Sequence, residues 1–312
     1  MGFQEDSVTL SLFASDVVDI TAGVGENVSQ DGLASCRQAV AQAQAKTPQE
    51  PTLCITTPEN LAAATVDIVS GLHEALGWRA PILGGASATQ EDGMTTRQFF
   101  CDRVLQDAVP VLLFSGPLAH SAGVATGWRP LGKMGRVTRS NGNLVHEIDD
   151  KPALKFYQYY LGAGATSDRT HVGIPLAVFE EGDGDFYLRV PIAYDENAGT
   201  AAFLGSVPEG ASVQLTHAAP EHILEGTEAS LTRALNAYGG SSGPEAALFF
   251  SCAVRKMLLG TRASKELDII RSRLGARIPV CGFYAFGEIG PVGSTENPRF
   301  HNEAFISLLL GT

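Results

Sequence analysis

The side chains best suited to chemistry lie toward the end of the chain, beginning with a cysteine and an arginine. Cys252 and Arg255 are three residues apart in SCAVRKMLLG, where an apolar strand is predicted to run into a helix. Unpaired N–H groups at a helix start attract anions and lower the pKa of a thiol. This pattern favours an anion site in which Arg255 holds a ligand carboxylate. The alternative is a buried thiol beside a structural arginine.

A second group of such residues follows in PVCGFYAFGEIG, at the end of another predicted strand. Gly282 and Gly287 would let the backbone approach a ligand. Tyr284 would form an aromatic wall with a polar tip, and Glu288 would bind an amine. The alternative is a core strand with a bulge at Gly287.

His301 and Asn302 come next, in an FHN sequence on the predicted return strand. We expect both side chains to point into the cleft that Glu288 and Arg255 share, where they would contact a small polar ligand. A single histidine is, however, more often a satisfied residue of the core than a ligand contact.

Two groups in the first half of the chain are secondary candidates for ligand contact. Gly84 and Gly85 end a predicted strand much as Gly282 does in the second half. Trp128 and Arg129 belong to the dense run GWRPLG, in which the guanidinium would stack on the indole. For this run the alternative is a purely structural corner.

Motifs for catalysis and metal binding are missing from the sequence. It contains no GxSxG elbow, no HExxH helix, no P-loop and no GxGxxG turn. Its seven histidines are not spaced as zinc ligands. We therefore predict no catalytic residues and no metal site. One enzymatic alternative remains, with Cys252 as nucleophile and His301 as its base.

Composition limits the partners that the chain can have. The 312 residues include 34 acidic and 22 basic side chains, a formal net charge of −12. Nucleic acid and anionic membrane surfaces attract basic faces, so we expect neither partner. No apolar run reaches the roughly 18–20 residues of a bilayer span, and a signal-peptide pattern is missing at the start. Five widely spaced cysteines without a CxxC pair indicate reduced thiols in a cytoplasmic protein.

The elements that position these residues predict an α/β fold of two related halves, with mixed sheets flanked by helices. TLCITTP, a helix, APILGG and VPVLLF in the first half are matched by AALFFSC, a helix, IPVCG and FISLLL in the second. The small, polar stretch GAGATSDRT places a boundary near residues 162–170.

Predicted strands cover residues 7–14, 52–56, 81–84, 109–114, 212–216, 246–251, 279–286 and 304–310, with residues 186–191 and 201–205 as a pair and residues 134–140 and 144–148 as a hairpin. Predicted helices cover residues 34–45, 57–76, 151–161, 221–238 and 265–274.

Several of these segments together resemble the FIST sensory-domain family. The resemblance rests on GWRPLG (127–132), VTRSNGNLVHEID (137–149), KPALKFYQYYLG (151–162), FSCAVRKMLLG (250–260), IPVCGFYAFGEIGP (278–291) and FHN (300–302). It implies a FIST N-terminal-like domain at residues 1–162 and a FIST C-terminal-like domain at residues 163–312. The usual opening strand–helix–strand, with its TAGE-like turn, is expected to be missing.

The resemblance implies an intracellular, non-enzymatic sensor of an amino-acid-like or other small polar ligand, which passes its signal to a separate histidine kinase or other signalling protein. No resident cofactor is expected. Some relatives are described as haem-binding nitric-oxide sensors, and this is the alternative function. Thr126 stands before GWRPLG where many relatives would carry His, so His146 or His301 would have to ligate a haem.

Overall fold

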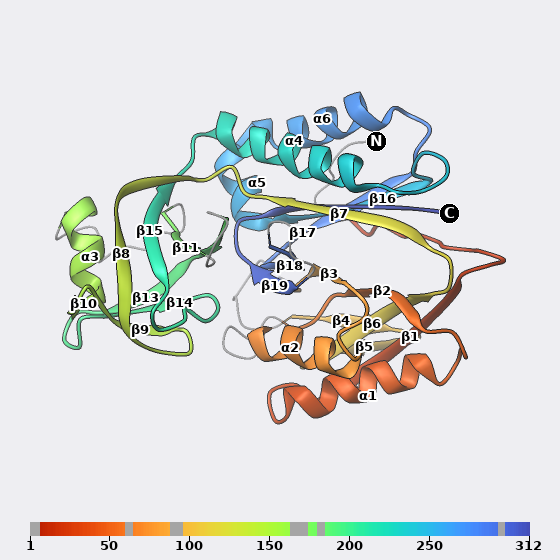
Figure 1. Ribbon diagram of the computed structural model, residues 1–312, viewed down its shortest axis with the longest axis horizontal. Helices are drawn as coiled ribbons and strands as arrows, with labels where there is room; N and C mark the ends of the chain where they lie inside the picture. The colour runs from red at the N-terminus through yellow and green to blue at the C-terminus, as the bar shows by residue number, and fades with distance from the viewer. Residues whose placement is uncertain (1–6, 60–64, 88–95, 163–173, 180–184, 293–296) are drawn as a thin grey trace.

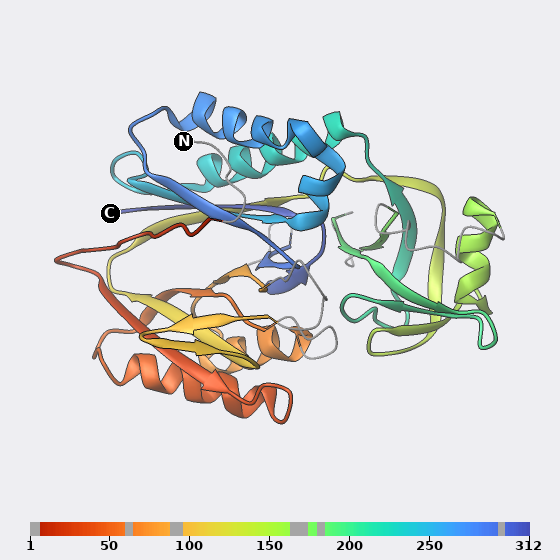
Figure 2. The ribbon, with the colours of Figure 1, turned by 180° about the vertical axis from the view of Figure 1, so that it is seen from behind.

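The protein is built as two face-to-face sheets with helices on both outer faces and a third sheet beside them (Figures 1 and 2). The computed structural model describes residues 7–59, 65–87, 96–162, 174–179, 185–292 and 297–312. This architecture confirms the predicted α/β class with mixed sheets and flanking helices.

The first sheet has six strands, in the order β1 (Asp19–Glu26), β6 (Ala108–Ser115), β2 (Pro51–Thr56), β3 (Ile82–Gly85), β18 (Glu288–Pro291) and β19 (Pro298–His301). Helices α1 (Gly32–Gln44) and α2 (Thr65–Ala75) cover its outer face and bury one apolar cluster against it (Figure 1). A two-stranded hairpin, β4 (Gln98–Phe100) and β5 (Arg103–Leu105), precedes β6.

The second sheet has four strands, in the order β17 (Val280–Ala285), β16 (Ala246–Cys252), β20 (Phe305–Gly311) and β7 (Ala119–Ala125). Its outer face carries α4 (Pro220–Ala237) and α6 (Ser264–Leu274), and α5 (Ala253–Leu259) with the 3-10 turn Gly260–Arg262 joins β16 to α6. On its inner face, Phe250, Ile306 and Leu308 belong to one apolar cluster with Leu53 and Leu83 of the first sheet.

The third sheet lies beside this sandwich and has its own core. Its strands run in the order β12 (Phe186–Arg189), β11 (Leu176–Phe179), β15 (Ser212–His217), β8 (Arg129–Asn141), β9 (Leu144–Ile148), β14 (Thr200–Phe203) and β13 (Pro191–Asp195), and β10 (Lys151–Pro152) pairs with β9. Helix α3 (Ala153–Leu161) packs on it through Tyr157, which contacts Tyr194 and Phe203.

The strand pairing confirms that the two halves are related. β1–β6–β2–β3 and β7–β20–β16–β17 have the same order, with two antiparallel pairs followed by a parallel pair. In both halves a helix lies directly on a strand glycine. A Cβ on Gly23 would be 2.0 Å from the carbonyl oxygen of Ala39 in α1, and one on Gly123 would be 2.0 Å from that of Ser230 in α4.

Each of the three large sheets contains strands from both sequence domains, that is, from both sides of residue 162. β7, from the N-terminal side of residue 162, completes the second sheet, while β18 and β19 from the C-terminal side extend the first. The third sheet joins β8–β10 to β11–β15. Strand pairs β18–β3, β20–β7, β15–β8 and β14–β9 therefore join the two sequence domains by hydrogen bonds in all three sheets.

The start of the chain differs from the prediction. Residues 7–14 form no strand, and Val8, Leu10 and Leu12 are 97%, 80% and 86% exposed. Phe13 is the one apolar side chain of this segment that packs on the core, against Phe114, and an alternating pattern does not make a strand without a neighbouring strand to pair with. The first strand among the described residues is β1, and β1–α1–β2 is a strand–helix–strand unit, although the resemblance led us to expect none at the start of the chain. Its Gly23 and Gly25 weaken the sequence signal for a strand, but the close approach of α1 requires them.

Other predicted elements differ at their ends and partners. Residues 186–191 and 201–205 meet only at Val190 and Pro191, because β12 ends at Arg189 and pairs with β11. The strand that pairs with β14 along its length is β13, which begins at Pro191. Residues 57–59 are not helical, and residues 60–64, including Leu61, lie outside the described residues. Lys151 and Pro152 form β10 instead of the first turn of α3.

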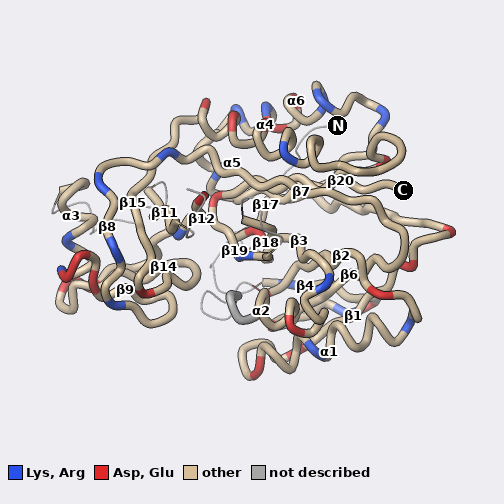
Figure 3. Tube along the Cα trace, viewed as in Figure 1, with Lys and Arg blue, Asp and Glu red and all other residues tan. Residues whose placement is uncertain are grey.

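Hydropathy and charge can be followed along the helices that the structure describes. Within the described ranges, no helix is long and apolar enough to cross a membrane. Basic and acidic positions are interspersed along α4 and α6 (Figure 3).

Candidate functional site

Arg255 is held inside the protein by hydrogen bonds that satisfy its guanidinium. It follows β16 in α5, as predicted, and its side chain is 0% exposed. Nη2 lies 2.9 Å from Glu266 Oε1 and 2.8 Å from the Ile223 carbonyl oxygen, and Nη1 donates to the Thr126 carbonyl. These bonds join α5, α6, α4 and the end of β7. Arg255 would have to give them up to hold a ligand carboxylate.

Tyr284 belongs to the same interior network. Its hydroxyl donates to Glu266 Oε2 at 2.8 Å, and Thr227 Oγ1 lies 3.0 Å from Glu266 Oε1. Sequence reasoning did not single out Glu266, although a signal was present. Glu266, Ile270 and Leu274 are four residues apart and form the buried face of α6.

Replacing Tyr284 with phenylalanine is expected to lower the free energy of unfolding by about 1.5–2 kcal/mol, because hydrogen bonds to charged groups are worth roughly that much. Urea unfolding of Y284F measures the effect. Tyr159→Phe is the control, since Tyr159 is 81% exposed. If the two variants were equally stable, the hydrogen bond from Tyr284 to Glu266 would not contribute to stability.

Cys252 and Glu288 lie together, and a third residue that sequence reasoning missed, Glu303, joins them. Glu288 is 0% exposed, and its Oε2 accepts a hydrogen bond from Ala304 N at 3.0 Å. Burial raises the pKa of Glu288 to about 8. Burial and the charges of Glu288 and Glu303 raise the pKa of the Cys252 thiol well above its usual value. A charged residue between FHN and an apolar strand was the available signal for Glu303.

His301 and Asn302 serve different parts of the fold. His301 Nε2 lies 3.1 Å from the carbonyl oxygens of both Gly290 and Pro291, and burial lowers its pKa to about 4. The ring is therefore neutral at physiological pH. Asn302 Oδ1 accepts from Val190 N at 2.9 Å, which ties the end of β19 to the third sheet.

The predicted glycines pack against protein atoms. A Cβ on Gly282 would lie 2.2 Å from the Phe249 carbonyl oxygen, and one on Gly287 would lie 2.0 Å from the Phe300 ring. A Cβ on Gly84 would lie 1.8 Å from the Thr56 carbonyl oxygen, and one on Gly85 would lie 2.7 Å from the Ala285 Cβ. Ala86 exchanges backbone hydrogen bonds with Phe286 and Gly287, so the two predicted glycine junctions meet in space.

The expected single hollow is therefore replaced by two interior clusters. Arg255 and Tyr284 meet at Glu266, Cys252 and Glu288 meet at Glu303, and Asn302 bonds to Val190. Of the eight main candidates, His301 is the one that lines the cavity described next.

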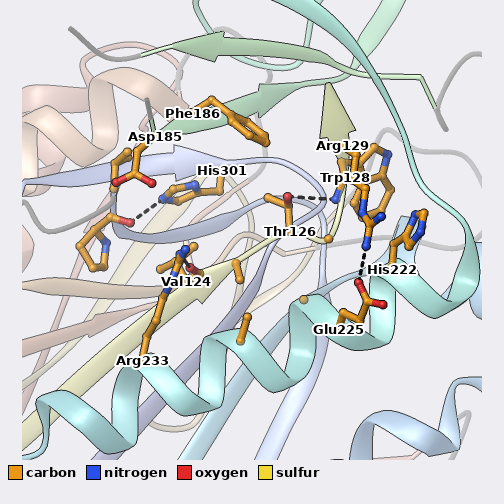
Figure 4. A pocket seen from close by; sticks show the side chains of 16 residues that line it. Val124, Thr126, Trp128, Arg129, Asp185, Phe186, His222, Glu225, Arg233 and His301 are labelled. Atoms are coloured by element: carbon orange, nitrogen blue, oxygen red, sulfur yellow. Dashed lines mark hydrogen bonds and ion pairs between the residues drawn. The ribbon is translucent and has the colours of Figure 1, made fainter. Parts of the chain in front are cut away.

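The α4 pocket is a cavity of about 300 Å³ beside α4, where β7 passes into β8 (Figure 4). Its lining comes from α4, from the β7–β8 corner, and from β12, β18 and β19: Val124, Ala125, Thr126, Gly127, Trp128, Arg129, Asp185, Phe186, His222, Glu225, Gly226, Ala229, Arg233, Pro291, Val292 and His301. The secondary candidates Trp128 and Arg129 thus line the same cavity as His301.

Small residues of α4 separate two charged ends of the pocket. Arg233 and Asp185 lie at one end, near His301, and Arg233 Nη1 donates to the Val124 carbonyl (Figure 4). At the other end Arg129 Nη2 is 2.7 Å from Glu225 Oε2. Gly226 lies where α4 approaches the β7–β8 corner, since a Cβ there would be 2.7 Å from Gly127 N. These α4 positions look like an ordinary exposed helix face in the sequence.

The two histidines considered as haem ligands, His301 and His146, are not placed for that role in the α4 pocket. His301 Nε2 is already engaged by two carbonyl groups, and His146 of β9 is not among the residues that line the α4 pocket. In the part of the chain that the structure describes, no three His, Cys, Asp or Glu residues are placed to bind a metal.

Comparison with known proteins places both parts of the chain in one family. The FIST N domain model matches residues 1–151, and the FIST C domain model matches residues 153–291. The chain is similar to the uncharacterized protein Rv0628c of Mycobacterium tuberculosis, with 29% identity over 185 residues that cover 56% of this chain and 48% of that protein. It is 27% identical to the uncharacterized protein Mb0898c of Mycobacterium bovis over 177 residues, 54% of this chain and 45% of that protein. The chain spans about half the length of these curated relatives.

Proposed function

This chain belongs to the FIST family of sensory and signal-transduction domains, and we propose that it senses a small zwitterionic ligand, such as an amino acid, in the α4 pocket. A volume of about 300 Å³ is at the lower end of the range for small-molecule sites. It suits a ligand of amino-acid size better than a large cofactor.

The observation that carries this proposal is that Arg233 and Asp185, side chains of opposite charge, both line one end of the pocket (Figure 4). The ammonium and carboxylate of an amino acid are attached to the same carbon atom, so a site for them needs both opposite charges at one end. Arg233 would bind the carboxylate and Asp185 the ammonium. The ligand's side chain would lie over Gly226 and Ala229, toward Phe186 and Trp128.

A binding role is favoured over an enzymatic one by the state of Cys252. A nucleophilic cysteine must reach its thiolate form, whereas burial and two neighbouring glutamates raise the pKa of this thiol. Its proposed base, His301, bonds instead to the Gly290 and Pro291 carbonyls. The pocket is also separate from Cys252, which is 5% exposed.

Signalling would follow from the position of the pocket between the third sheet and the sandwich. A ligand that contacts Asp185 and Phe186 on one side and α4 on the other stabilises the arrangement that brings both together. All five cysteines are free thiols, which supports a reducing compartment such as the cytoplasm. A separate histidine kinase or other signalling protein would read the change.

The test is titration calorimetry with the protein amino acids, and with ethylammonium and propionate as half-ligands. We expect an amino acid to bind more tightly than either half-ligand, and Arg233→Met to weaken its binding at least tenfold, as for loss of a charge-assisted bond. Asp185→Asn should weaken binding of the amino acid but spare propionate.

The matched control is Arg79→Met, because Arg79 is an exposed arginine paired with Glu50. The proposal fails if no amino acid binds, or if R233M binds as well as R79M does.

A further inference from the structure

Two glutamates, Glu288 and Glu303, lie inside the protein where the two sheets of the sandwich and the third sheet meet. Glu288 is the first residue of β18, and Glu303 lies in the turn between β19 and β20. Both are 0% exposed. We call Cys252, Glu288 and Glu303 the carboxyl joint, because the hydrogen bonds beside them hold these parts together.

Three of these hydrogen bonds cross between sheets or between their strands. Ala304 N, just before β20, donates to Glu288 Oε2 on β18. Asn302 Oδ1 accepts from Val190 N of the third sheet at 2.9 Å. Arg189 Nη1 donates to the Phe300 carbonyl at 2.9 Å. A change at the joint would therefore act on the docking of the β18–β19 hairpin and of the third sheet.

Most hydrogen-bonding capacity of the two carboxyl groups is unused within the described ranges. Although the Cys252 thiol and the Gly287 N–H lie near enough to Glu288 to act against the rise of its pKa, Glu288 Oε1 and both carboxyl oxygens of Glu303 have no hydrogen-bond partner there. The same is true of the buried Tyr157 hydroxyl, which comes from α3 on the third-sheet side. Burial, Tyr194 and Glu303 together raise the pKa of Tyr157, so the Glu303 carboxyl lies within electrostatic reach of that phenol.

The backbone conformation at Glu303 is also unusual for a residue with a long side chain. Its φ is +55°, in the left-handed region that non-glycine side chains rarely adopt. Such a conformation persists where the surrounding structure compels it. Here it directs a long, acidic side chain into the interior instead of to solvent.

The cations near the joint are committed to other partners. Arg255 of α5 acts on both glutamates, but its N–H groups bond to Glu266, Thr227 and two carbonyls. Arg189 of β12 donates to the carbonyls of Leu188, Ser206 and Phe300.

The remaining titratable groups that face the joint do not supply a positive charge. Cys252 from β16 is a thiol and Tyr157 from α3 is a phenol. His301 on β19, which pairs with Glu288 in the sheet register, is neutral because burial lowers its pKa to about 4. Two ionised carboxylates at this place would remain buried without adequate neutralisation, which is strongly unfavourable.

We propose that Glu288 and Glu303 are carboxylic acids in the folded protein and that loss of their protons opens the joint between the β18–β19 hairpin, β20 and the third sheet. The fold then contains a proton-operated device that does not depend on a ligand in the α4 pocket. In the opened state the ionised carboxylates gain water, and the Ala304 and Asn302 hydrogen bonds are lost.

The direction of the pH effect follows from proton linkage. Burial raises the pKa of Glu288 from 4.5 to about 8, and burial together with Glu288 raises that of Glu303. Between pH 4.5 and about pH 8, the folded protein holds protons that the unfolded chain has released. Stability therefore falls as pH rises, and each such proton increases the unfolding constant about tenfold per pH unit between about pH 5 and 8.

The first experiment measures urea unfolding of the full chain at pH 6, 7 and 8. The slope of the logarithm of the unfolding constant against pH should fall by about one proton in Glu288→Gln and again in Glu303→Gln. Glu74→Gln is the control, because Glu74 is exposed and paired with Arg37. Slopes in both variants equal to that of E74Q would overturn the proposal.

Infrared spectroscopy of the wild type tests the same claim without relying on a variant that folds. A protonated-carboxyl band should be present at pH 7 and decline as pH rises. Amide hydrogen exchange at residues 286–304, corrected for its intrinsic pH dependence, should then accelerate relative to β2 and β6. The proposal is contradicted if the protonated-carboxyl band is absent or if the relative exchange rate stays constant with pH. It is also contradicted if added potassium or magnesium stabilises the protein at fixed pH, because a bound cation would then take the place of the protons.

Discussion

Replacing Arg255 with alanine is expected to lower the free energy of unfolding by about 3–5 kcal/mol, the usual cost of breaking a buried ion pair by removing one partner. Arg255 and Glu266 both have 0% exposed side chains, and their closest atoms are 2.9 Å apart. Without the guanidinium, the Glu266 carboxylate keeps Tyr284 and Thr227 but loses its countercharge. Urea unfolding measures the loss.

A double variant and a surface control make this test specific. Arg255→Met with Glu266→Leu should recover most of the lost stability, because replacing both members of a buried pair by apolar residues is often neutral. Arg273→Ala should cost less than about 1 kcal/mol, since Arg273 forms a more exposed pair with Glu228. If R255A were as stable as R273A yet lost ligand binding, Arg255 would be the ligand anchor that its sequence context suggested.

Substituting alanine for Gly23 or Gly123 is expected to destabilise the protein by about 3 kcal/mol in each case, at the upper end of typical overpacking costs. In each half the new Cβ would lie 2.0 Å from a carbonyl oxygen of the covering helix, that of Ala39 or Ser230. Helix and strand would have to separate. In the second half this would also disturb the bond that Ser230 Oγ donates to the Gly123 carbonyl at 2.8 Å.

Gly243→Ala is the control for both variants, because no atom lies within 4 Å of the position of its Cβ. Similar losses in G23A and G123A with an unchanged G243A would establish that the two halves use the same helix–strand contact. A loss in one half alone would mean that the shared strand order does not extend to how the helices pack.

Local patterns were sufficient for most individual elements. Apolar runs such as AALFFSC and the four-residue spacing in α6 are local properties. The matching sets of elements predicted the relation of β2, β3 and β6 to β16, β17 and β20, but not β1 and β7, which complete the two halves. Errors arose where tertiary contacts override local preference. Residues 7–14 alternate, but Val8, Leu10 and Leu12 are exposed and the segment pairs with no strand in the described residues. In contrast, β1 contains Gly23 and Gly25 because α1 lies against it.

Sequence reasoning also located several chemically distinctive residues, but not their partners. It singled out Arg255, Tyr284, Cys252 and Glu288, which are all at least partly buried. Glu266 and Glu303, which bring them together in two clusters, looked like ordinary charged positions. Arg233 and Asp185 were missed for the same reason, because a charged residue on a helix or in a loop is normally solvated.

The order of residues along the chain determined the family, the α/β class, the repeated halves and the presence of unusual polar groups in an apolar setting. Tertiary structure decided which of those groups meet, because sheets combine strands from both sides of residue 162 and bring β18 beside β3 and β7 beside β20. Burial of a charge is tolerable only with a suitable neighbour, and such neighbours come from distant segments. The assignment of Arg255 to an interior pair and of Arg233 to a pocket therefore depends on long-range packing that no local pattern encodes.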